Sequence, residues 1–260
     1  MLALNRITTL LLLVSGVVTS AQLTVKSPQQ TIAVVKLEDG TRLEKFYEQV
    51  PWPQNINWRT AFISDFATTQ NVRAQGDALL QKLAELETRW RNSGDGDLAI
   101  SAWLLRKAIS PINVAGRIHT DLDPDRVRVY IENNRPLVGE YALYIAPHDD
   151  RLSLIGLVNT SADVGELETS GKVALHAGWS LEDYLAGRRL LAGADNSYGY
   201  LIGGNGQWRK VPLALWNRQH SEPAAGEMLF IGFDPSVLPQ DMSSLNDQLA
   251  DYLANRTPLE

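Results

Sequence analysis

The apolar and polar positions of this chain predict one series of elements that occurs twice. In the second half, residues 151–158 (RLSLIGLV) alternate as a half-buried strand does. A short amphipathic segment follows at 177–187, where Ser180 before Leu-Glu-Asp is a typical helix N-cap. Residues 198–213 then predict two strands joined by the turn GGNG, and 226–233 (GEMLFIGF) predict a closing strand.

The first half repeats this order of elements. Its predicted parts are strands at 22–27 and 31–37, a short helix at 39–50, a strand at 125–132 and a closing strand at 139–145. The two closing strands share a pattern of Pro, two small or apolar residues, Gly-Glu and an apolar run, at 136–145 and 223–232. The sequence therefore predicts an α+β unit in two tandem copies.

The two copies differ in length, and the difference predicts an insertion. From short helix to closing strand, the first copy is about 50 residues longer. Apolar residues recur at helical spacing from Leu79 to Trp90, and again at 97–110 until Pro111. We therefore expect a helical hairpin at about 55–110, between the short helix and the next strand. Two such helices cannot bury their apolar faces alone, so the hairpin should dock on the second copy.

A last amphipathic helix is predicted at 242–256. Its apolar face contains Met242, Leu245, Leu249, Tyr252 and Leu253. At 1.5 Å per residue the helix is about 20 Å long, too short to span a bilayer. Docking on the protein's own surface is one interpretation, and membrane insertion or contact with another copy is the alternative.

Residues 1–21 are typical of a secretory signal peptide. One cation, Arg6, precedes an apolar run from Leu10 to Val18, and small residues lead to a cleavage site near Ala21. A membrane anchor is the alternative, but the run is short for a hydrocarbon core of about 30 Å. The chain has no cysteine, which excludes a lipid-attachment cysteine and disulfides. We expect a periplasmic mature protein without a membrane span.

Composition narrows the function classes further. Hydrophobic residues make up 44% of the chain, enough for a real core, and the net charge of -6 argues against a nucleic-acid partner.

The sequence predicts no catalytic residue, metal site or cofactor. The four histidines are dispersed and have no cysteine partner. The acidic stretches at 121–125 (DLDPD) and 148–150 (HDD) indicate polar turns rather than metal sites. The turn GGNG at 203–206 lacks the Lys-Ser that follows the glycines of a phosphate-binding loop. No serine stands in a nucleophile-elbow context, and nothing selects a carboxylate pair for glycoside hydrolysis.

Seven tryptophans leave glycan stacking open. Trp90 and Trp103 fall on the apolar faces of the inserted helices and should belong to the core. Five others lie near loops or strand ends and are candidates either for packing or for sugar platforms: Trp52, Trp58, Trp179, Trp208 and Trp216.

Four segments of the second copy resemble SLBB-type β-grasp units of outer-membrane polysaccharide export proteins: LIGLVN, GWSLEDYLAG, YLIGGNGQWRKVPL and AGEMLFIGF. With the insertion and the final helix, residues 22–255 resemble the GfcC family of periplasmic capsule-assembly proteins. The resemblance implies tandem β-grasp (ubiquitin-like) domains at 22–148 and 151–234, and a monomer. It also implies a non-enzymatic role in assembly or export of a group 4 (O-antigen type) capsule or a related exopolysaccharide. The polysaccharide and the outer-membrane export machinery are the implied partners, and a glycan-binding or glycan-modifying protein is the alternative.

The resemblance also implies an important central arginine, and Arg117 is the matching position. Arg117 directly follows Gly116, where the insertion returns to the sheet. Its planar fork of donors suits either a structural role, holding carbonyls and carboxylates of several segments, or capture of an acidic sugar. We expect it to be buried and held by backbone carbonyls or an acidic side chain. An exposed strand arginine is the alternative.

Overall fold

The computed structural model describes residues 20–28, 30–161, 166–214, 216 and 220–258. The predicted signal peptide therefore lies almost entirely outside the described residues.

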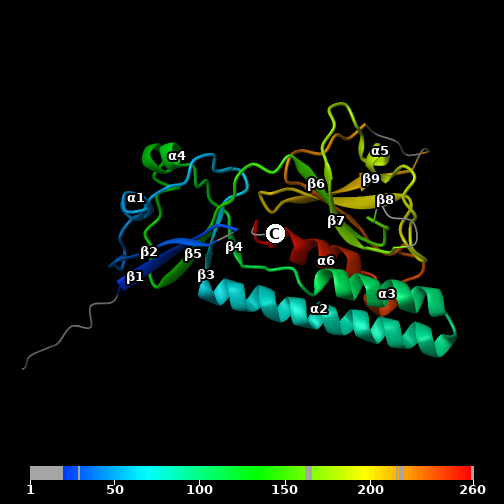
Figure 1. Cartoon of the computed structure of the whole chain (residues 1–260). Coiled ribbons are helices and arrows are strands. Elements are labelled where there is room, and N and C mark those ends of the chain that lie inside the picture. The colour runs from blue at the N-terminus through cyan, green and yellow to red at the C-terminus, as the bar shows by residue number, and fades with distance from the viewer. Residues whose placement is uncertain (1–19, 29, 162–165, 215, 217–219, 259–260) are drawn as a thin grey trace, which may run out of the picture.

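The chain folds into two five-stranded mixed sheets with the same internal arrangement (Figure 1). The first sheet has the order β2-β1-β5-β3-β4, built from β1 (Ser20–Lys26), β2 (Thr31–Glu38), β3 (Phe62–Asp65), β4 (Arg117–Ile118) and β5 (Glu140–Tyr144). The second has the order β7-β6-β10-β8-β9, built from β6 (Arg151–Gly156), β7 (Ser170–Ala174), β8 (Tyr198–Ile202), β9 (Trp208–Pro212) and β10 (Met228–Ile231). In each sheet the opening strand pairs parallel with the closing strand and the other neighbours are antiparallel. The predicted tandem β-grasp fold of the α+β class is confirmed.

Each sheet carries the predicted short helix on one face, α1 (Leu43–Tyr47) in the first unit and α5 (Leu181–Leu185) in the second. Ser180 forms a capping box with Asp183 at the start of α5, as its position before Leu-Glu-Asp indicates.

The strand predicted at 125–132 was wrong, because this segment contains a helix, α4 (Pro124–Val129). Asp123 caps the helix by accepting a hydrogen bond from the Asp125 backbone N–H, and Pro124 occupies its first turn. The apolar and polar alternation that favoured a strand leaves Val127 buried but Val129 72% exposed.

The inserted hairpin consists of α2 (Phe66–Ser93) and α3 (Gly96–Ile109). Its predicted start near residue 55 was wrong, because β3 precedes it and pairs with both β5 and β4. The insertion therefore lies between β3 and β4, the two strands that correspond to the β8–β9 hairpin of the second unit. In that hairpin a short turn at 203–207 occupies the equivalent place.

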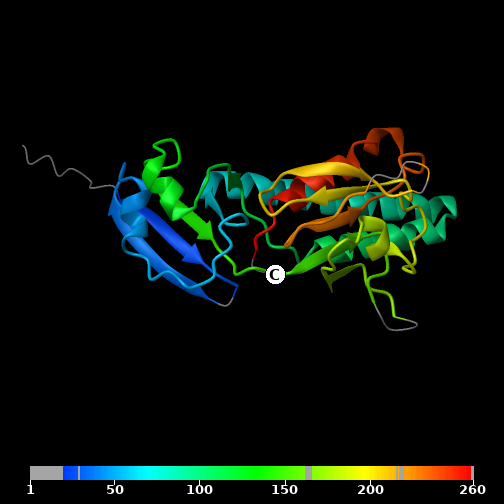
Figure 2. The same cartoon turned by 90° about the horizontal axis from the view of Figure 1, so that it is seen from above.

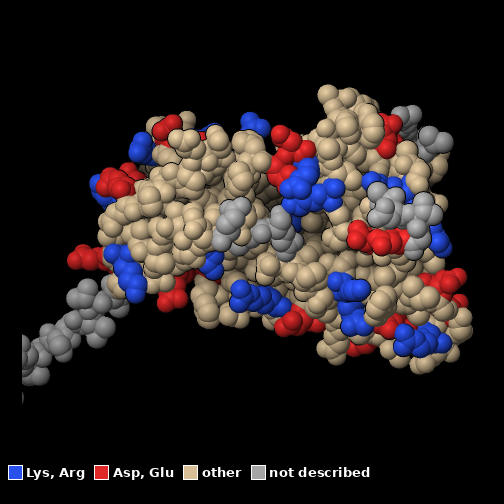
Figure 3. Space-filling view, viewed as in Figure 1, with Lys and Arg blue, Asp and Glu red and all other residues tan. Residues whose placement is uncertain are grey.

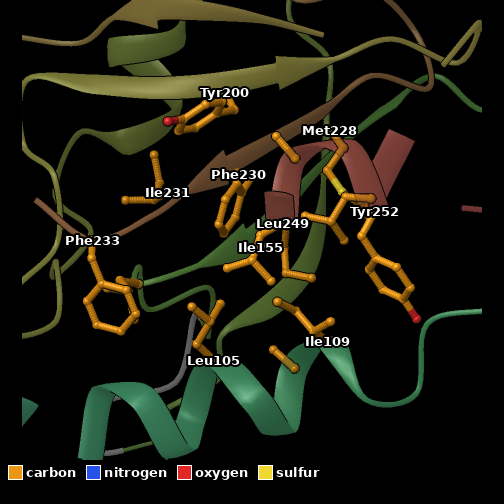
Figure 4. Packing of buried hydrophobic residues seen from close by; sticks show 14 of the residues in the cluster. Leu105, Ile109, Ile155, Tyr200, Met228, Phe230, Ile231, Phe233, Leu249 and Tyr252 are labelled. Atoms are coloured by element: carbon orange, nitrogen blue, oxygen red, sulfur yellow. The ribbon is translucent and has the colours of Figure 1, made fainter. Parts of the chain in front are cut away.

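The hairpin extends away from the first sheet and lies beneath the second (Figures 1 and 2). The terminal helix α6 (Leu245–Ala254) follows a 3-10 turn, η2 (Gln240–Met242), and packs between α2–α3 and the second sheet. Figure 4 shows Leu249 of α6 among Leu105 and Ile109 of α3 and Phe230 of β10. Docking of the terminal helix on the protein's own surface is thereby confirmed: Leu245, Leu249 and Leu253 are at most 1% exposed.

A separate apolar cluster fills the first unit between its sheet, α1 and α4. In the described part of the chain, no helix has the combination of length and apolar character that crossing a bilayer requires.

Candidate functional site

Two adjoining cavities lie where the first unit, the second unit and the C-terminal segment meet. Their volumes are about 210 and 770 Å³, and both are lined by Asn57, Thr60, Arg117 and Gly204. We call them together the central cleft. Figure 3 shows basic side chains beside acidic ones at this junction between the two halves of the molecule.

The predicted residue Arg117 lies in this cleft and contacts three segments. Its backbone N–H donates to Asn255 Oδ1 (3.1 Å), and its guanidinium carbon lies 3.9 Å from the centre of the Phe62 ring. The β8–β9 turn approaches from the second unit: a Cβ on Gly206 would lie 2.5 Å from the Cδ and Nε of Arg117. The first unit, the second unit and the C-terminal segment therefore meet at one residue.

Glycines make this close approach possible. A Cβ on Gly204 would lie 2.4 Å from Thr60 Cγ2, and one on Gly116 would lie 2.4 Å from the carbonyl carbon of Thr68 at the start of α2. The turn GGNG is thus a hairpin turn, as predicted, but two of its glycines also let the second unit pack against the first.

The guanidinium of Arg117 is not held as we expected. Its Nε is buried and has no hydrogen-bond partner among the described residues. Burial, and then repulsion from the neighbouring Arg256, lower its pKa from the ordinary arginine value to about 9. At neutral pH the group is therefore a charged, largely desolvated cation close to a second cation.

Arg256 has the bonding pattern that we predicted for Arg117. Its guanidinium donates to the backbone oxygens of Leu253 (3.3 Å), Ile202 (3.3 Å) and Gly226 (3.0 Å), which belong to separate segments. In the sequence Arg256 is the last residue of the helix predicted at 242–256, and a basic residue at a helix C-terminus is ordinarily explained by the helix dipole. Nothing in the local pattern indicates its contacts with the second sheet.

The remaining charged groups of the smaller cavity are Lys172 and Asp149. Asp149 accepts hydrogen bonds from Arg151 Nε (2.6 Å) and Lys172 Nζ (3.0 Å). Burial raises the pKa of Asp149, but these two cations outweigh it and hold the pKa below its ordinary value. With Arg117 and Arg256 included, this cavity has more positive than negative charge, which suits an anionic ligand.

The acidic stretches indicate no metal site. In 148–150, Asp149 is engaged by two cations as described, and in 121–125, Asp121 pairs with Arg126 (2.8 Å) while Asp123 caps α4. Across the described residues, no group of three or more His, Cys, Asp or Glu side chains could hold a metal ion.

The tryptophans divide between packing and exposure. Trp90 is buried as expected, but the core position predicted for Trp103 was wrong: it is 42% exposed on the outer face of α3, with Lys107 Nζ 5.4 Å from its ring centre. Trp52 and Trp58 pack edge to face on each other (5.2 Å), and Trp58 also lines the larger cavity of the central cleft.

The other three tryptophans belong to the second unit. Trp208 donates to Asp251 of α6 (2.7 Å), which makes it a packing residue. Trp179 and Trp216 are exposed.

These features define a class: tandem β-grasp proteins with a helical hairpin inserted in the first sheet and a charged cleft between the units. Two family profiles match the chain, "Capsule biosynthesis GfcC, N-terminal" over residues 21–148 and "Capsule biosynthesis GfcC C-terminal" over residues 169–258. The chain is also 34% identical over 220 residues to the uncharacterized protein YjbG of Escherichia coli (strain K12), covering 84% of each chain. The chain belongs to the GfcC family of capsule biosynthesis proteins, and this membership supports a role in capsule or exopolysaccharide assembly.

Proposed function

We propose that this chain is a periplasmic, non-enzymatic accessory protein for assembly or export of a group 4 type capsule or a related exopolysaccharide. In this proposal it acts as a monomer beside the outer-membrane export machinery, and its central cleft binds an anionic part of the polysaccharide at Arg117. The family membership supports the assembly role. The signal-like sequence at 1–21 supports the periplasmic location.

The observation that carries the cleft proposal is the unpartnered Nε of Arg117. A buried donor without an acceptor is costly, and a buried cation without a counter-charge is more costly still. A carboxylate or phosphate of the polymer would accept two hydrogen bonds from the planar guanidinium. It would also offset the repulsion between Arg117 and Arg256, which lowers the pKa of Arg117.

The charges of the smaller cavity support binding over catalysis. Both oxygens of its carboxylate, Asp149, accept hydrogen bonds from cations, and the pKa of this carboxylate is lowered. Asp149 therefore remains ionised, and a role in forming the cavity wall fits it better than proton transfer.

Complementation of a deletion strain tests the proposal. The strain receives the wild-type chain, Arg117→Gln, or a matched control, Arg209→Gln, on the equivalent edge strand β9. The control arginine is exposed, and its nearest carboxylate is 3.8 Å away. We expect secreted polysaccharide to fall on deletion and to return with the wild type and the control. The Arg117 variant should not restore it, although immunoblots show equal periplasmic levels.

Each part of the proposal has its own contrary outcome. Unchanged secretion in the deletion strain would reject the assembly role. Full rescue by Arg117→Gln would reject the cleft as the binding site. Recovery of the mature chain only from the cytoplasm would reject the location.

A further inference from the structure

The two sheets differ in how many of their faces are covered. In the second unit α5 lies on one face, and α6 with the α2–α3 hairpin lies on the other, so all four residues of β10 are buried (Figures 1 and 4). In the first unit α1 covers one face, and in the part of the chain that the structure describes only the first turns of α2 reach the other (Figure 1). Along β1 buried residues accordingly alternate with partly exposed ones.

The partly covered face forms a groove against α2, which we call the open-face groove. Its floor consists of side chains from β1, β5 and β3: Gln22, Thr24, Lys26, Glu140, Tyr144 and Ser64. Its wall consists of Phe66, Gln70 and Arg73 on α2. The groove holds about 210 Å³, below the roughly 300–1,000 Å³ of typical small-molecule pockets. This volume suits one ring of a longer ligand rather than a whole small molecule.

The chemistry of this groove differs from that of the same face in the second unit. There Met228, Phe230 and Ile155 present an apolar surface to α6. Here Thr24 and Gln22 present a hydroxyl and an amide group, with Gln22 Nε2 donating to Thr24 Oγ1 (3.4 Å), while the Ser64 hydroxyl is buried and donates to the Ala142 oxygen. An apolar helix like α6 would leave the groups of Thr24 and Gln22 without partners for their remaining hydrogen bonds. Hydroxyl and amide side chains both donate and accept hydrogen bonds, which matches the hydroxyl groups of a sugar.

Aromatic rings complete the groove. Tyr144 stacks on Phe62 (4.9 Å between ring centres), and Lys26 Nζ lies 5.6 Å from the centre of the Tyr144 ring. Phe66 is 64% exposed beside the groove, which is unusual for a phenylalanine and leaves a ring face for stacking.

The charges of the groove are balanced. Lys26 and Arg73 are opposed by Glu140 and Asp65, and Asp65 is already engaged as the N-cap of α2 by the Thr68 N–H (2.7 Å) and hydroxyl (2.8 Å). The groove therefore differs from the cationic central cleft and favours a neutral or singly acidic sugar ring.

We propose that the open-face groove binds one pyranose ring of the polysaccharide, as a second glycan contact distinct from the central cleft. Amides and hydroxyls of the floor and wall bond the sugar hydroxyls, and Phe66 packs against the ring. This inference rests on the proposed function, because the ligand is taken from the polymer that the protein helps to assemble.

Affinity measurements with purified protein test the groove. The probe is a set of oligosaccharides released by mild acid from the exopolysaccharide of the complemented strain, and binding is followed by calorimetry. The groove variant is Gln70→Ala/Arg73→Ala, which removes two exposed side chains from α2 and replaces them with a good helix former. The control is Gln81→Ala, an exposed position farther along the same helix.

We expect the groove variant to bind about tenfold more weakly, because the polar contacts of the Gln70 and Arg73 side chains with the sugar are lost. The control should bind as the wild type does, and both variants should melt at the wild-type temperature. Unchanged affinity in the groove variant together with weaker binding by Arg117→Gln would overturn the groove and leave the central cleft in place.

Two other outcomes also decide against the groove. If the wild type binds no oligosaccharide while the deletion strain still loses secretion, the groove is not a glycan site and the assembly role stands. If ultracentrifugation shows a dimer that the groove variant disrupts, the face is a self-association surface instead.

Discussion

The side-chain amide of Asn246 in α6 forms both backbone hydrogen bonds of Phe233, the second residue after β10. The Phe233 N–H donates to Asn246 Oδ1 (2.9 Å), and Asn246 Nδ2 donates to the Phe233 oxygen (2.6 Å). Both residues are buried. Gly232 lets the amide approach, because a Cβ there would lie 2.4 Å from Asn246 Oδ1. The terminal helix is thus fixed to the second sheet by polar contacts as well as by its leucines.

Replacing Asn246 by leucine should destabilise the protein strongly. The change keeps the side-chain size but leaves a buried N–H and a buried C=O without partners, at about 1–3 kcal/mol each. We expect the free energy of unfolding in urea to fall by about 2–5 kcal/mol. Asn92→Leu, on the exposed surface of α2, should change it little. Equal effects of the two changes would contradict the role of the amide.

Truncating Leu249 should be similarly costly. Leu249 is fully buried between the hairpin and the second sheet, so Leu249→Ala leaves a cavity and should lower the free energy of unfolding by about 2–5 kcal/mol. Ile100→Ala, at a position 54% exposed on α3, is the matched control. A loss no larger than that of the control would show that the apolar face of α6 contributes little to the fold.

Removing the charge of Arg117 should not unfold the protein. Because Nε has no described acceptor and burial and Arg256 disfavour the cation, Arg117→Gln should keep the free energy of unfolding within about 1 kcal/mol of the wild type. Arg117→Ala should be less stable because it also loses packing on Phe62. A fall of about 3–5 kcal/mol for the glutamine variant in urea would instead show that the arginine belongs to a buried ion pair.

Two glycines with the same backbone φ, Gly206 and Gly178, allow the contact between Arg117 and the β8–β9 turn to be tested. Gly206 and Gly178 have the same backbone φ of 81°, but a Cβ would meet Arg117 at Gly206 and nothing within 4 Å at Gly178. Gly206→Ala should therefore lose more stability than Gly178→Ala and should also reduce polysaccharide secretion. Since the two glycines have the same φ, the difference in melting temperature reports the crowding at Gly206, where Arg117 lies nearest and the Ala254 oxygen would be 3.3 Å from the added Cβ. Equal melting temperatures and equal secretion would argue against that contact.

Stability should depend on Asp149 in acid. Its folded-state pKa lies below the ordinary value of 3.8, so its contribution is present above that value and is lost as pH falls through the lowered pKa. At neutral pH we expect Asp149→Asn to cost about 1 kcal/mol or less, since the pair is partly exposed. Urea unfolding of both proteins should converge as the pH falls below the ordinary pKa. A difference that persists in acid would assign the effect to packing.

The sequence predicts the repeat well because its strands alternate clearly and Ser180 marks a helix start. It misplaces the insertion because β3 and β4 are very short, and β4 contains only Arg117 and Ile118. Strands of this length have too few positions for a periodicity, and their identity comes from pairing with β5 and with each other. The helix α4 was missed for a related reason, because a six-residue helix with one buried valine does not differ in pattern from a strand.

The site was predictable only in part. The junction between insertion and sheet indicates where Arg117 lies, since the chain must return there to complete the first unit. Its partners arise from the packing of segments more than 80 residues apart, such as Gly206 and Asn255, which no local pattern encodes. The open-face groove likewise depends on the direction in which α2 leaves the first sheet. That direction follows from the docking of the hairpin on the second sheet.

The position of the insertion also affects how the chain folds. In the second unit β8 and β9 close over a five-residue turn, so they can pair early, whereas β3 and β4 are joined only through the whole of α2 and α3. Those helices find most of their apolar partners on the second sheet and α6. We therefore expect the edge of the first sheet to be completed after the second unit has formed, so that the two copies fold as one cooperative unit in which the C-terminal half leads.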